Sequence, residues 1–542
     1  MRSGNRHRTA VAGVILLLGA LLLTACGGGT SAAGAGDRAG GSAGSGGAPR
    51  TGGGLVVGLY LEPLALDPHR QGYWETYRVS SNIFEGLVKE DLSDTAGPTK
   101  LLPALATDWS VSKDGRTWTF TLRQGVRFHD GSPFDAEAVH KNVRRVTDPG
   151  YEFYDETSAA RLKNWLGDLE EGRVVDEHTY EFRFARPFLG FPRILAQSMS
   201  TLTIGNPATW ERYGNDGFAD HPSGTGPYTF VSRTVGDRIV LRRNPDYWGD
   251  PPYLDELVFR IIPNHQTRLA ALLNGEVDLI SYVQPDDVAT LESRGFQVPE
   301  GHGAALLYFT FNARNKAFQD RRVRQAIIQG IDRERLAREV YNGHAVALGS
   351  LLPPGNEAYD PQARDFPYDP EAAKSLLRQA GYGPGALGFT IVADVANQNL
   401  AEWLQSHLKG IGVNVEVVTL DRPSYVARAF GRPEPEDGLS IDEYGGSYAE
   451  WLQQVINTNV VPKGFDLDAH PDLRKAVEKA RYTADADRRI ELWRKADEQA
   501  RKEAIAIPAV SLTRYYALGP NVRGFVFPAT NWYDLTKVWL AD

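Results

Sequence analysis

The spacing of apolar residues along this chain switches repeatedly between a period of two and a helical period. Residues 117–122 read Thr-Trp-Thr-Phe-Thr-Leu, an alternation that predicts a half-buried strand. Just before it, Asp114-Gly115 predicts a hairpin turn, because both residues tolerate positive φ. Beyond it, Asp135 is placed to cap a helix on which valines recur at i, i+4 and i+7 from Val139. A hairpin followed by a helix is therefore expected here.

The same kind of alternation covers most of the chain after Leu55. The apolar residues Val79, Ile83, Phe84 and Leu87 predict one helix. Strands are predicted within 55–61, 255–263 and 388–397, a second hairpin within 170–187, helices within 320–343 and 369–382, and helix-to-strand segments within 265–280, 401–420 and 484–510. Alternating helices and strands with hairpins among them predict a mixed α/β to α+β fold.

The first 54 residues follow a different pattern. A cationic head precedes an apolar run from Val11 to Leu23, which fits the h-region of a secretory signal peptide. The run is too short to span a bilayer, since spanning takes roughly 20 apolar residues. It ends in Leu-Thr-Ala-Cys, and Cys26 is the only cysteine of the chain. Residues 31–54 are mostly Gly, Ala and Ser, a composition that predicts a flexible tether.

The sequence around Cys26 resembles the lipobox of bacterial lipoproteins. The resemblance implies a signal peptide over residues 1–25, lipidation of Cys26 and a lipidated tether over residues 26–54. An ordinary signal peptide with a chance cysteine is the alternative. The expected location is extracytoplasmic, on the periplasmic side if the cell has an outer membrane, with a lipid anchor holding the protein to the cell membrane.

Size and charge narrow the class of protein. The residues that follow the tether, roughly 490, are too many for one core, so two or three lobes are expected. The net charge is −9 and nothing favours nucleic acid, which calls for basic patches. No later stretch approaches ~18 uninterrupted apolar residues, so no transmembrane helix is predicted. A single cysteine also rules out an internal disulfide framework.

Five blocks follow one another along the chain: "LATDWSVSKDGRTWTFTLRQGVRFHDGSPFDAEAV", "GTGPYTFVSRTVGDRIVLRRNPDYWG", "LNGEVDLI", "FNARNKAFQDRRVRQAIIQGIDRERL" and "SLLRQAGY". In this order they resemble the family-5 extracellular solute-binding proteins, the dipeptide-, oligopeptide- and nickel-binding receptors of ABC importers. The resemblance implies the three-lobed fold of large peptide-binding proteins, with ligand between lobes I and III. Lobe I is expected over 55–98, 221–303 and 513–542, lobe II over 99–220 and lobe III over 304–512.

The resemblance also implies the activity and its partners. The protein is expected to be a monomer without catalytic activity, cofactor or metal site that delivers a peptide or similar small polar solute to an ABC permease with ATPase subunits. A metal-complex (nickel-type) receptor, an oligosaccharide receptor and a ligand-sensing lipoprotein without transport are the alternatives. A secreted hydrolase is disfavoured, because no Gly-x-Ser-x-Gly elbow joins a predicted strand to a predicted helix, the sequence has no His-Glu-x-x-His motif, and its histidines are scattered.

The segment "LSIDEYGGSYAEWLQQV" is the candidate for the ligand pocket. Peptide-binding relatives carry an aspartate here that pairs with the peptide amino terminus, and counting back from Trp451 puts Tyr444 in its place. Asp442 or Glu443 is therefore expected to supply the charge for a cationic group of the ligand, because a buried carboxylate needs a partner. Tyr444 and Trp451 are expected to contact the ligand beside it. A solvated loop with core aromatics is the alternative.

Further candidates for ligand contact lie in three other regions. Tyr308 and Asn312 belong to "LLYFTFN", which resembles the first strand of lobe III at the border of the cleft. Tyr73 and Trp74 lie in a lobe I loop of the kind that lines the cleft, and Trp403 begins a lobe III helix. A place in the hydrophobic core is the alternative for each of them.

Overall fold

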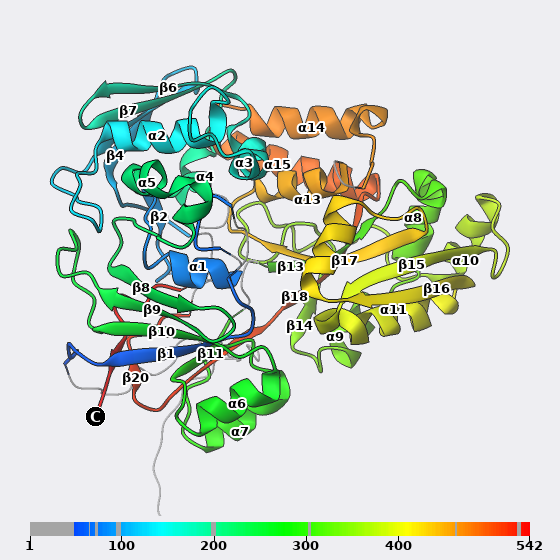
Figure 1. Ribbon diagram of the computed structural model, residues 1–542. Helices are drawn as coiled ribbons and strands as arrows, with labels where there is room; N and C mark the ends of the chain where they lie inside the picture. The colour runs from blue at the N-terminus through cyan, green and yellow to red at the C-terminus, as the bar shows by residue number, and fades with distance from the viewer. Residues whose placement is uncertain are drawn as a thin grey trace, which may run out of the picture. The chain divides into compact units, whose positions relative to one another are not determined.

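The chain folds around sheets whose strands come from distant parts of the sequence, as the computed structural model shows (Figure 1). The structure describes residues 48–63, 65–70, 74–93, 99–196, 202–301, 305–460, 463–527 and 533–542. Residues 45–542 form one compact unit. The predicted signal peptide, Cys26 and most of the predicted tether lie outside the described residues. Within the described part, no helix is both long and apolar enough to cross a membrane.

A seven-stranded sheet has its core on the side of Leu55, Val57 and Leu59, which alternate inward along its first strand. Its strand order is β12 (Glu300–Gly301), β19 (Arg514–Leu518), β11 (Leu279–Ser281), β1 (Gly54–Leu59), β10 (Glu256–Ile261), β9 (Arg238–Arg243) and β8 (Tyr228–Thr234). Strand β1 runs parallel to β10 and β11, whereas the other neighbours are antiparallel. The chain segments between these strands include α1 (Trp74–Ser80), α5 (Pro207–Phe218), α6 (His265–Leu273) and α7 (Pro285–Ser293).

A six-stranded sheet is covered on both faces, so every residue of β13 and β18 is buried. Its order is β14 (Ala345–Ala347), β18 (Ala506–Leu512), β13 (Ala305–Phe311), β17 (Asp437–Gly445), β15 (Leu387–Asp394) and β16 (Val413–Leu420). One face packs on α8 (Arg321–Gln329), α9 (Arg333–Glu339), α10 (Pro370–Gln379) and α11 (Gln398–Lys409). The other face packs on α12 (Arg422–Val426), α13 (Trp451–Val460), α14 (Pro471–Arg481) and α15 (Ala486–Lys502).

A four-stranded antiparallel sheet buries one face and exposes the other. Its order is β4 (Ala106–Val111), β5 (Thr117–Leu122), β7 (Thr179–Phe184) and β6 (Leu169–Asp176), and its core includes residues of α2 (Ala136–Thr147), α3 (Glu156–Leu166) and α4 (Phe191–Ala196). Two short antiparallel pairs complete the described strands: β2 (Val88–Glu90) with β3 (Leu101–Pro103), and β20 (Val522–Arg523) with β21 (Trp539–Leu540).

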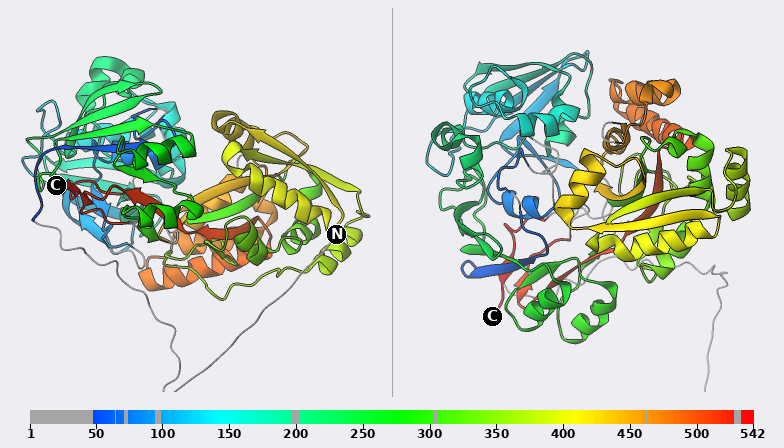
Figure 2. Two further views of the ribbon diagram at one scale, coloured as in Figure 1. Left: turned by 90° about the horizontal axis from the view of Figure 1, so that it is seen from below. Right: turned by 45° about the vertical axis from the view of Figure 1, so that its right-hand side comes forward.

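The chain crosses between the seven-stranded and six-stranded sheets at two points. Strand β12 leads into β13, and β18 leads into β19 through the single residue Thr513. Figure 2 shows this second crossing as the red ribbon that runs from one sheet to the other. The backbone N–H of Thr513 donates to the carbonyl of His344 at 3.0 Å. The division of the chain into three lobes, with its boundaries, stays a prediction.

The turn, strand and helix cap predicted within residues 114–135 are confirmed. Gly115 adopts φ +70° in the turn between β4 and β5. The side chain of Asp135 accepts a hydrogen bond from the backbone N–H of Ala138 at 2.8 Å and so caps α2. Trp118, Phe120 and Leu122 are buried, as the period of two predicts.

The helix predicted through Leu87 is wrong beyond Ser80, where α1 ends. Asn82 closes it, because its side-chain amide donates to the carbonyl of Arg78 at 2.8 Å. The next backbone carbonyls instead accept from another segment: Asn82 from the N–H of Tyr228 at 3.0 Å and Ile83 from the N–H of Gly226 at 2.9 Å. Tertiary hydrogen bonds thus override the apolar spacing here.

Glu85, shortly after the end of α1, binds side chains from two other segments of the chain. Its carboxylate accepts hydrogen bonds from Thr225 Oγ1 at 2.8 Å, Tyr247 Oη at 2.8 Å and Trp248 Nε1 at 2.7 Å. Burial raises the pKa of Glu85, while these three donors oppose that rise. The "GTGPY" and "NPDYWG" motifs therefore meet on one carboxylate and serve the fold.

Candidate ligand-binding site

The end of β17 presents two acidic side chains to opposite faces of the six-stranded sheet. Asp442 lies on the face that carries Thr310 and Ser440, and it is 2% exposed. Its carboxylate accepts hydrogen bonds from Thr310 Oγ1 at 2.8 Å and from Tyr425 Oη at 3.1 Å. Lys463 Nζ lies 3.5 Å from the same carboxylate. The sheet interior therefore holds a complete buried ion pair.

Lys463 supplies the cation that the burial of Asp442 requires. Its ammonium also donates to Thr310 and Ser440, so the charge is embedded in hydroxyl groups. Burial lowers the pKa of Lys463, and the nearby Asp442 acts in the opposite direction. The argument that a buried acid in this segment implies a cationic ligand thus has no force at Asp442, because the partner belongs to the chain itself.

Glu443 points to the other side of β17 and contacts Arg514, the first residue of β19. The guanidinium Nη2 donates to a carboxylate oxygen of Glu443. The side chains are 26% and 13% exposed, so this pair is accessible to solvent where the Asp442 pair is not. The contact joins the six-stranded sheet to the seven-stranded sheet one residue beyond Thr513.

Aromatic rings and a second ion pair surround Arg514 on the side of the seven-stranded sheet. The Arg514 guanidinium lies 4.8 Å from the ring centroid of Tyr282, and the Arg78 guanidinium lies 5.3 Å from the same centroid. Arg78 pairs with Glu75 within α1, and both are 1% exposed. Burial raises the pKa of Tyr282 to about 12, and the charge of Glu443 adds to this rise. Two guanidinium groups and two carboxylates thus share one tyrosine-rich cluster.

Tyr444 and Trp451 lie in an aromatic group beside β17. The ring centroid of Tyr444 is 5.9 Å from that of Trp451 and 6.0 Å from that of Tyr308. Trp451, at the first position of α13, also makes an edge-on contact with Trp165 of α3 at 6.5 Å. Tyr308 and Trp451 are buried, whereas Tyr444 is half-buried. Of these three candidates, Tyr444 is the one whose exposure leaves room for ligand contact.

The remaining candidates lie apart from this group or outside the description. Asn312 is buried, and its amide donates to the carbonyls of Glu434 and Asp437 at 2.9 Å each, a role within the fold. Trp403 donates its indole N–H to Glu339 of α9 at 2.9 Å and stacks on His407, so it faces α9. Trp74 begins α1 and is half-buried.

Tyr73 lies outside the described residues, so its predicted contact stays a prediction. The contacts of the ligand-pocket candidates favour Glu443 and Tyr444 over Asp442, Tyr308 and Asn312.

Arg514, Tyr282 and Arg78 form the part of the site that sequence reasoning missed. The sequence carries a weak signal for Arg514. Arg514 interrupts two apolar runs, "IAIPAVSL" and "YYAL", at the point where the chain was expected to leave lobe III. A charged residue between two apolar runs needs a partner if it is buried, and this could have marked Arg514.

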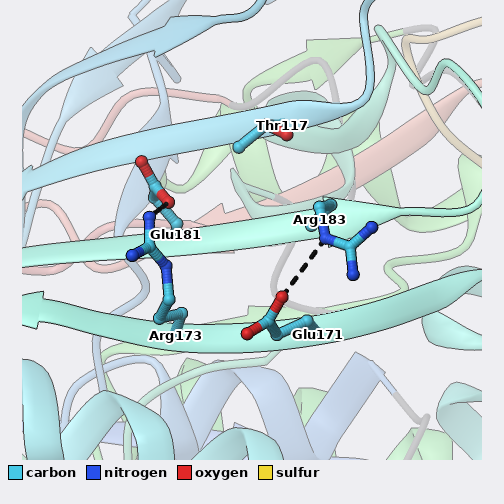
Figure 3. A pocket seen from close by; sticks show the side chains of 5 residues that line it. All are labelled: Thr117, Glu171, Arg173, Glu181 and Arg183. Atoms are coloured by element: carbon cyan, nitrogen blue, oxygen red, sulfur yellow. Dashed lines mark hydrogen bonds and ion pairs between the residues drawn. The ribbon is translucent and has the colours of Figure 1, made fainter.

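A depression on the exposed face of the four-stranded sheet is lined by Thr117, Glu171, Arg173, Glu181 and Arg183 (Figure 3). Its charges are paired across the strands: Arg173 contacts Glu181, and Arg183 Nε lies 3.2 Å from Glu171. No aromatic side chain is among its lining residues. Opposite charges facing one another on neighbouring strands are an ordinary way to stabilise an exposed sheet face, so this depression is not our candidate ligand site.

Across the described segments, no group of three or more His, Cys, Asp or Glu side chains is arranged to hold a metal ion.

Comparisons with known proteins give the chain its family. The model of the family "Bacterial extracellular solute-binding proteins, family 5 Middle" matches residues 100–450. The dipeptide-binding protein of Escherichia coli (strain K12) is 28% identical over 460 residues, 79% of this chain and 84% of the relative. The glutathione-binding protein GsiB of Salmonella paratyphi A is 28% identical over 491 residues, 88% of this chain and 92% of the relative.

A solved structure extends the likeness to the fold. The periplasmic binding protein DppA of Helicobacter pylori, in complex with the peptide STSA, is 26% identical with a TM-score of 0.81, and the match covers 91% of this chain and 99% of that one. The mixed α/β fold of the large peptide-binding type, expected from the sequence, is confirmed. The chain belongs to the bacterial extracellular solute-binding proteins of family 5.

Proposed function

We propose that this protein is the substrate-binding lipoprotein of an ABC importer and that it captures short peptides. The observation that carries the proposal is the family match over residues 100–450, together with relatives named for binding a dipeptide and glutathione. Such a protein binds its solute without changing it, and we assign it no catalytic role.

The geometry around the two crossings supports capture between the sheets. Domain closure about a few connecting residues is the common way for two-part binding proteins to enclose a ligand. Glu443 and Arg514 come from different sheets and meet beside the crossing at Thr513. Half-buried Tyr282 and Tyr444 add flat apolar surface with a polar edge nearby. A small solute with charged ends and a short backbone fits this chemistry.

The location and the delivery step belong to the same proposal. Lipidation of Cys26 would hold the protein at the outer surface of the cell membrane, and residues 26–54 would give it reach. Two or more acyl chains give a stable anchor, whereas one gives only marginal binding. The loaded protein would then pass its solute to the permease, which the ATPase subunits drive.

The proposal is tested by identifying what the protein carries. Native mass spectrometry of the full-length lipoprotein, extracted from its own host in mild detergent, is expected to show bound peptides of a few residues that disappear on denaturation. Isothermal titration calorimetry with the peptides so identified then measures affinity. If the bound species is a metal complex or a sugar, or if no peptide from a defined dipeptide mixture is retained, peptide capture is refuted.

A further inference from the structure

Glu90 lies in a buried hydroxyl cluster built from two distant parts of the chain. Its Oε1 accepts hydrogen bonds from Thr99 Oγ1 at 2.6 Å and from Ser447 Oγ at 3.1 Å, and the two hydroxyl oxygens are 3.0 Å apart. Glu90 ends β2 and Thr99 precedes β3, whereas Ser447 follows β17. All three residues are buried. One carboxyl group thus joins the β2–β3 pair to the chain that leaves the six-stranded sheet.

Residues 446–450 are fixed to the side of the six-stranded sheet. Asn356 donates its amide to two carbonyls of this segment, at 2.9 and 2.7 Å. The backbone N–H of Glu357 donates to a third carbonyl at 2.9 Å. Glu450 pairs with Arg489 of α15. A displacement of the six-stranded sheet would therefore carry this segment with it.

The β2–β3 pair is held from the other side by α4. Nη1 of Arg193 on α4 donates to the carbonyl of Thr99 at 3.1 Å, and Nη2 lies 3.6 Å from Glu357 across the contact. Tyr448 and Trp451 complete the contact by packing into the core of the four-stranded sheet. Separation of residues 446–450 from the β2–β3 pair would therefore expose the Glu90 cluster to solvent.

The surroundings of Glu90 favour a neutral carboxyl group while the contact is closed. Burial raises the pKa of Glu90 to about 7, although the two hydroxyl donors and the charge of Arg193 act in the opposite direction. On the facing side, Glu357 and Glu450 both pair with Arg489. Oε2 of Glu90 is buried and has no hydrogen-bond partner among the described residues. A charged carboxylate with one bare oxygen is costly in such a place.

We propose that Glu90 is a proton-operated latch: it takes up one proton from the solvent when residues 446–450 close on the β2–β3 pair, and it releases that proton when they separate. The proton sits on Oε2, because Oε1 already accepts from two hydroxyl groups. This latch rests on the closure that belongs to the proposed function and adds its dependence on pH. An acidic medium favours the closed form that holds the solute, and a basic medium favours opening.

The size of the effect follows from the two states of the carboxyl group. In the closed contact its pKa is about 7. Once exposed it returns toward the ordinary value of about 4.3. Between pH 8 and pH 5.5 the closed form therefore comes to bind nearly one proton more than the open form. Linkage then raises the ratio of closed to open protein by at least about tenfold over this range.

Single-molecule FRET on the full-length, detergent-solubilised protein measures this ratio. Dyes are attached at Val175→Cys on β6 and at Tyr368→Cys before α10, positions with exposures of 44% and 46%. They report on the four-stranded and the six-stranded sheet. The labelled protein is compared from pH 5.5 to pH 8 with versions that also carry a latch or control substitution, and a parent without the two added cysteines reports any dye on Cys26.

Asp497→Asn is the matched control substitution. Burial raises the pKa of Asp497 to about 7, the same value as for Glu90. Its hydrogen-bond partners are Ser350, the backbone of Leu351 and Arg501, all on the side of the six-stranded sheet. This carboxyl group stays buried whether the latch is open or closed, so the control should keep the full response to pH.

The labelled protein and the control are expected to show a closed-to-open ratio at least tenfold higher at pH 5.5 than at pH 8. Glu90→Gln should hold the ratio near its acidic value throughout. An equal response with and without Glu90, or no response in the labelled protein, overturns the latch. A parallel series with a defined equimolar dipeptide mixture separates this result from the proposed function: closure on addition leaves peptide capture standing, and no effect of the mixture at any pH counts against capture.

Ser447→Ala keeps the measurement decisive if Glu90→Gln fails to fold. The Ser447 hydroxyl stabilises the ionised carboxylate of the closed contact, so its loss should raise the pKa of Glu90 further. The closed-to-open ratio is then expected to change around a higher pH than in the unsubstituted labelled protein. An unchanged midpoint would show that the hydroxyl does not act on Glu90 and would overturn the latch.

Discussion

Replacing Lys463 with methionine tests whether the Asp442 carboxylate is balanced from within the protein. The substitution keeps most of the aliphatic volume and removes the ammonium. Asp442 would remain on a sheet face where its side chain has no solvent contact, still accepting from Thr310 and Tyr425 but without a counter-charge. Breaking a buried ion pair by removing one partner costs about 3–5 kcal/mol, because an uncompensated charge stays behind.

The double variant supplies the second half of this test. Changing Asp442 to Asn as well removes the orphaned charge and keeps an acceptor for the two hydroxyl donors, so most of the loss is expected to be recovered. Equilibrium urea unfolding followed by tryptophan fluorescence measures both effects. Lys141→Met is the control, because the Lys141–Glu211 pair is about one-third exposed and such pairs contribute about 0–1 kcal/mol.

A loss below about 1 kcal/mol for Lys463→Met, equal to the control, would refute the reasoning. It would mean that Asp442 reaches water or a different cation. A double variant no more stable than the single one would equally show that the two side chains do not act as a pair. Either result would return Asp442 to the set of residues open to a cationic ligand.

Three further predictions concern other parts of the chain. Burial raises the pKa of Glu90 to about 7, so the stability that its protonated form contributes is full below the unfolded pKa and is lost as the pH rises through 7. Urea titrations should show the free energy of unfolding of the wild type falling on the order of 2–3 kcal/mol between pH 5 and 8 from this group, and Glu90→Gln should remove that fall. Glu85→Ala should cost about 2–4 kcal/mol by the same assay, because three donors lose their acceptor; a loss no larger than that of Lys141→Met would contradict this. Cys26→Ser should move the protein from the membrane to the soluble or secreted fraction on immunoblots, and unchanged fractionation would exclude lipidation at that residue.

The fold could be predicted from the sequence wherever one local rule acted alone. The alternation around Phe120 and the cap at Asp135 need only neighbouring residues, and both are as expected. The failure beyond Ser80 has a definite cause: the carbonyls of Asn82 and Ile83 accept from residues 226–228, which lie more than 140 positions away. A local pattern cannot report on hydrogen bonds of that range.

The candidate site could be predicted only in part, for the same reason. The segment around Glu443 was found because it is compact in sequence and rich in acids and aromatic residues. The partners of its two acids, Lys463 and Arg514, come from other segments of the chain. No spacing within the segment reveals which acid pairs with which base. Sequence reasoning therefore placed Asp442 and Glu443 together as alternatives, whereas the structure separates them onto opposite faces of β17.

Motifs that identify the family serve the framework of this molecule. Glu85 shows why: two recognisable motifs converge on it through Thr225, Tyr247 and Trp248, and all of these contacts serve the framework. A match to those motifs reports a shared scaffold and carries no information about charge in the cleft. The Glu443–Arg514 pair, by contrast, joins the six-stranded sheet to the seven-stranded sheet through residues that lie outside the five blocks. A relative with the same five blocks but without this pair should then share the fold.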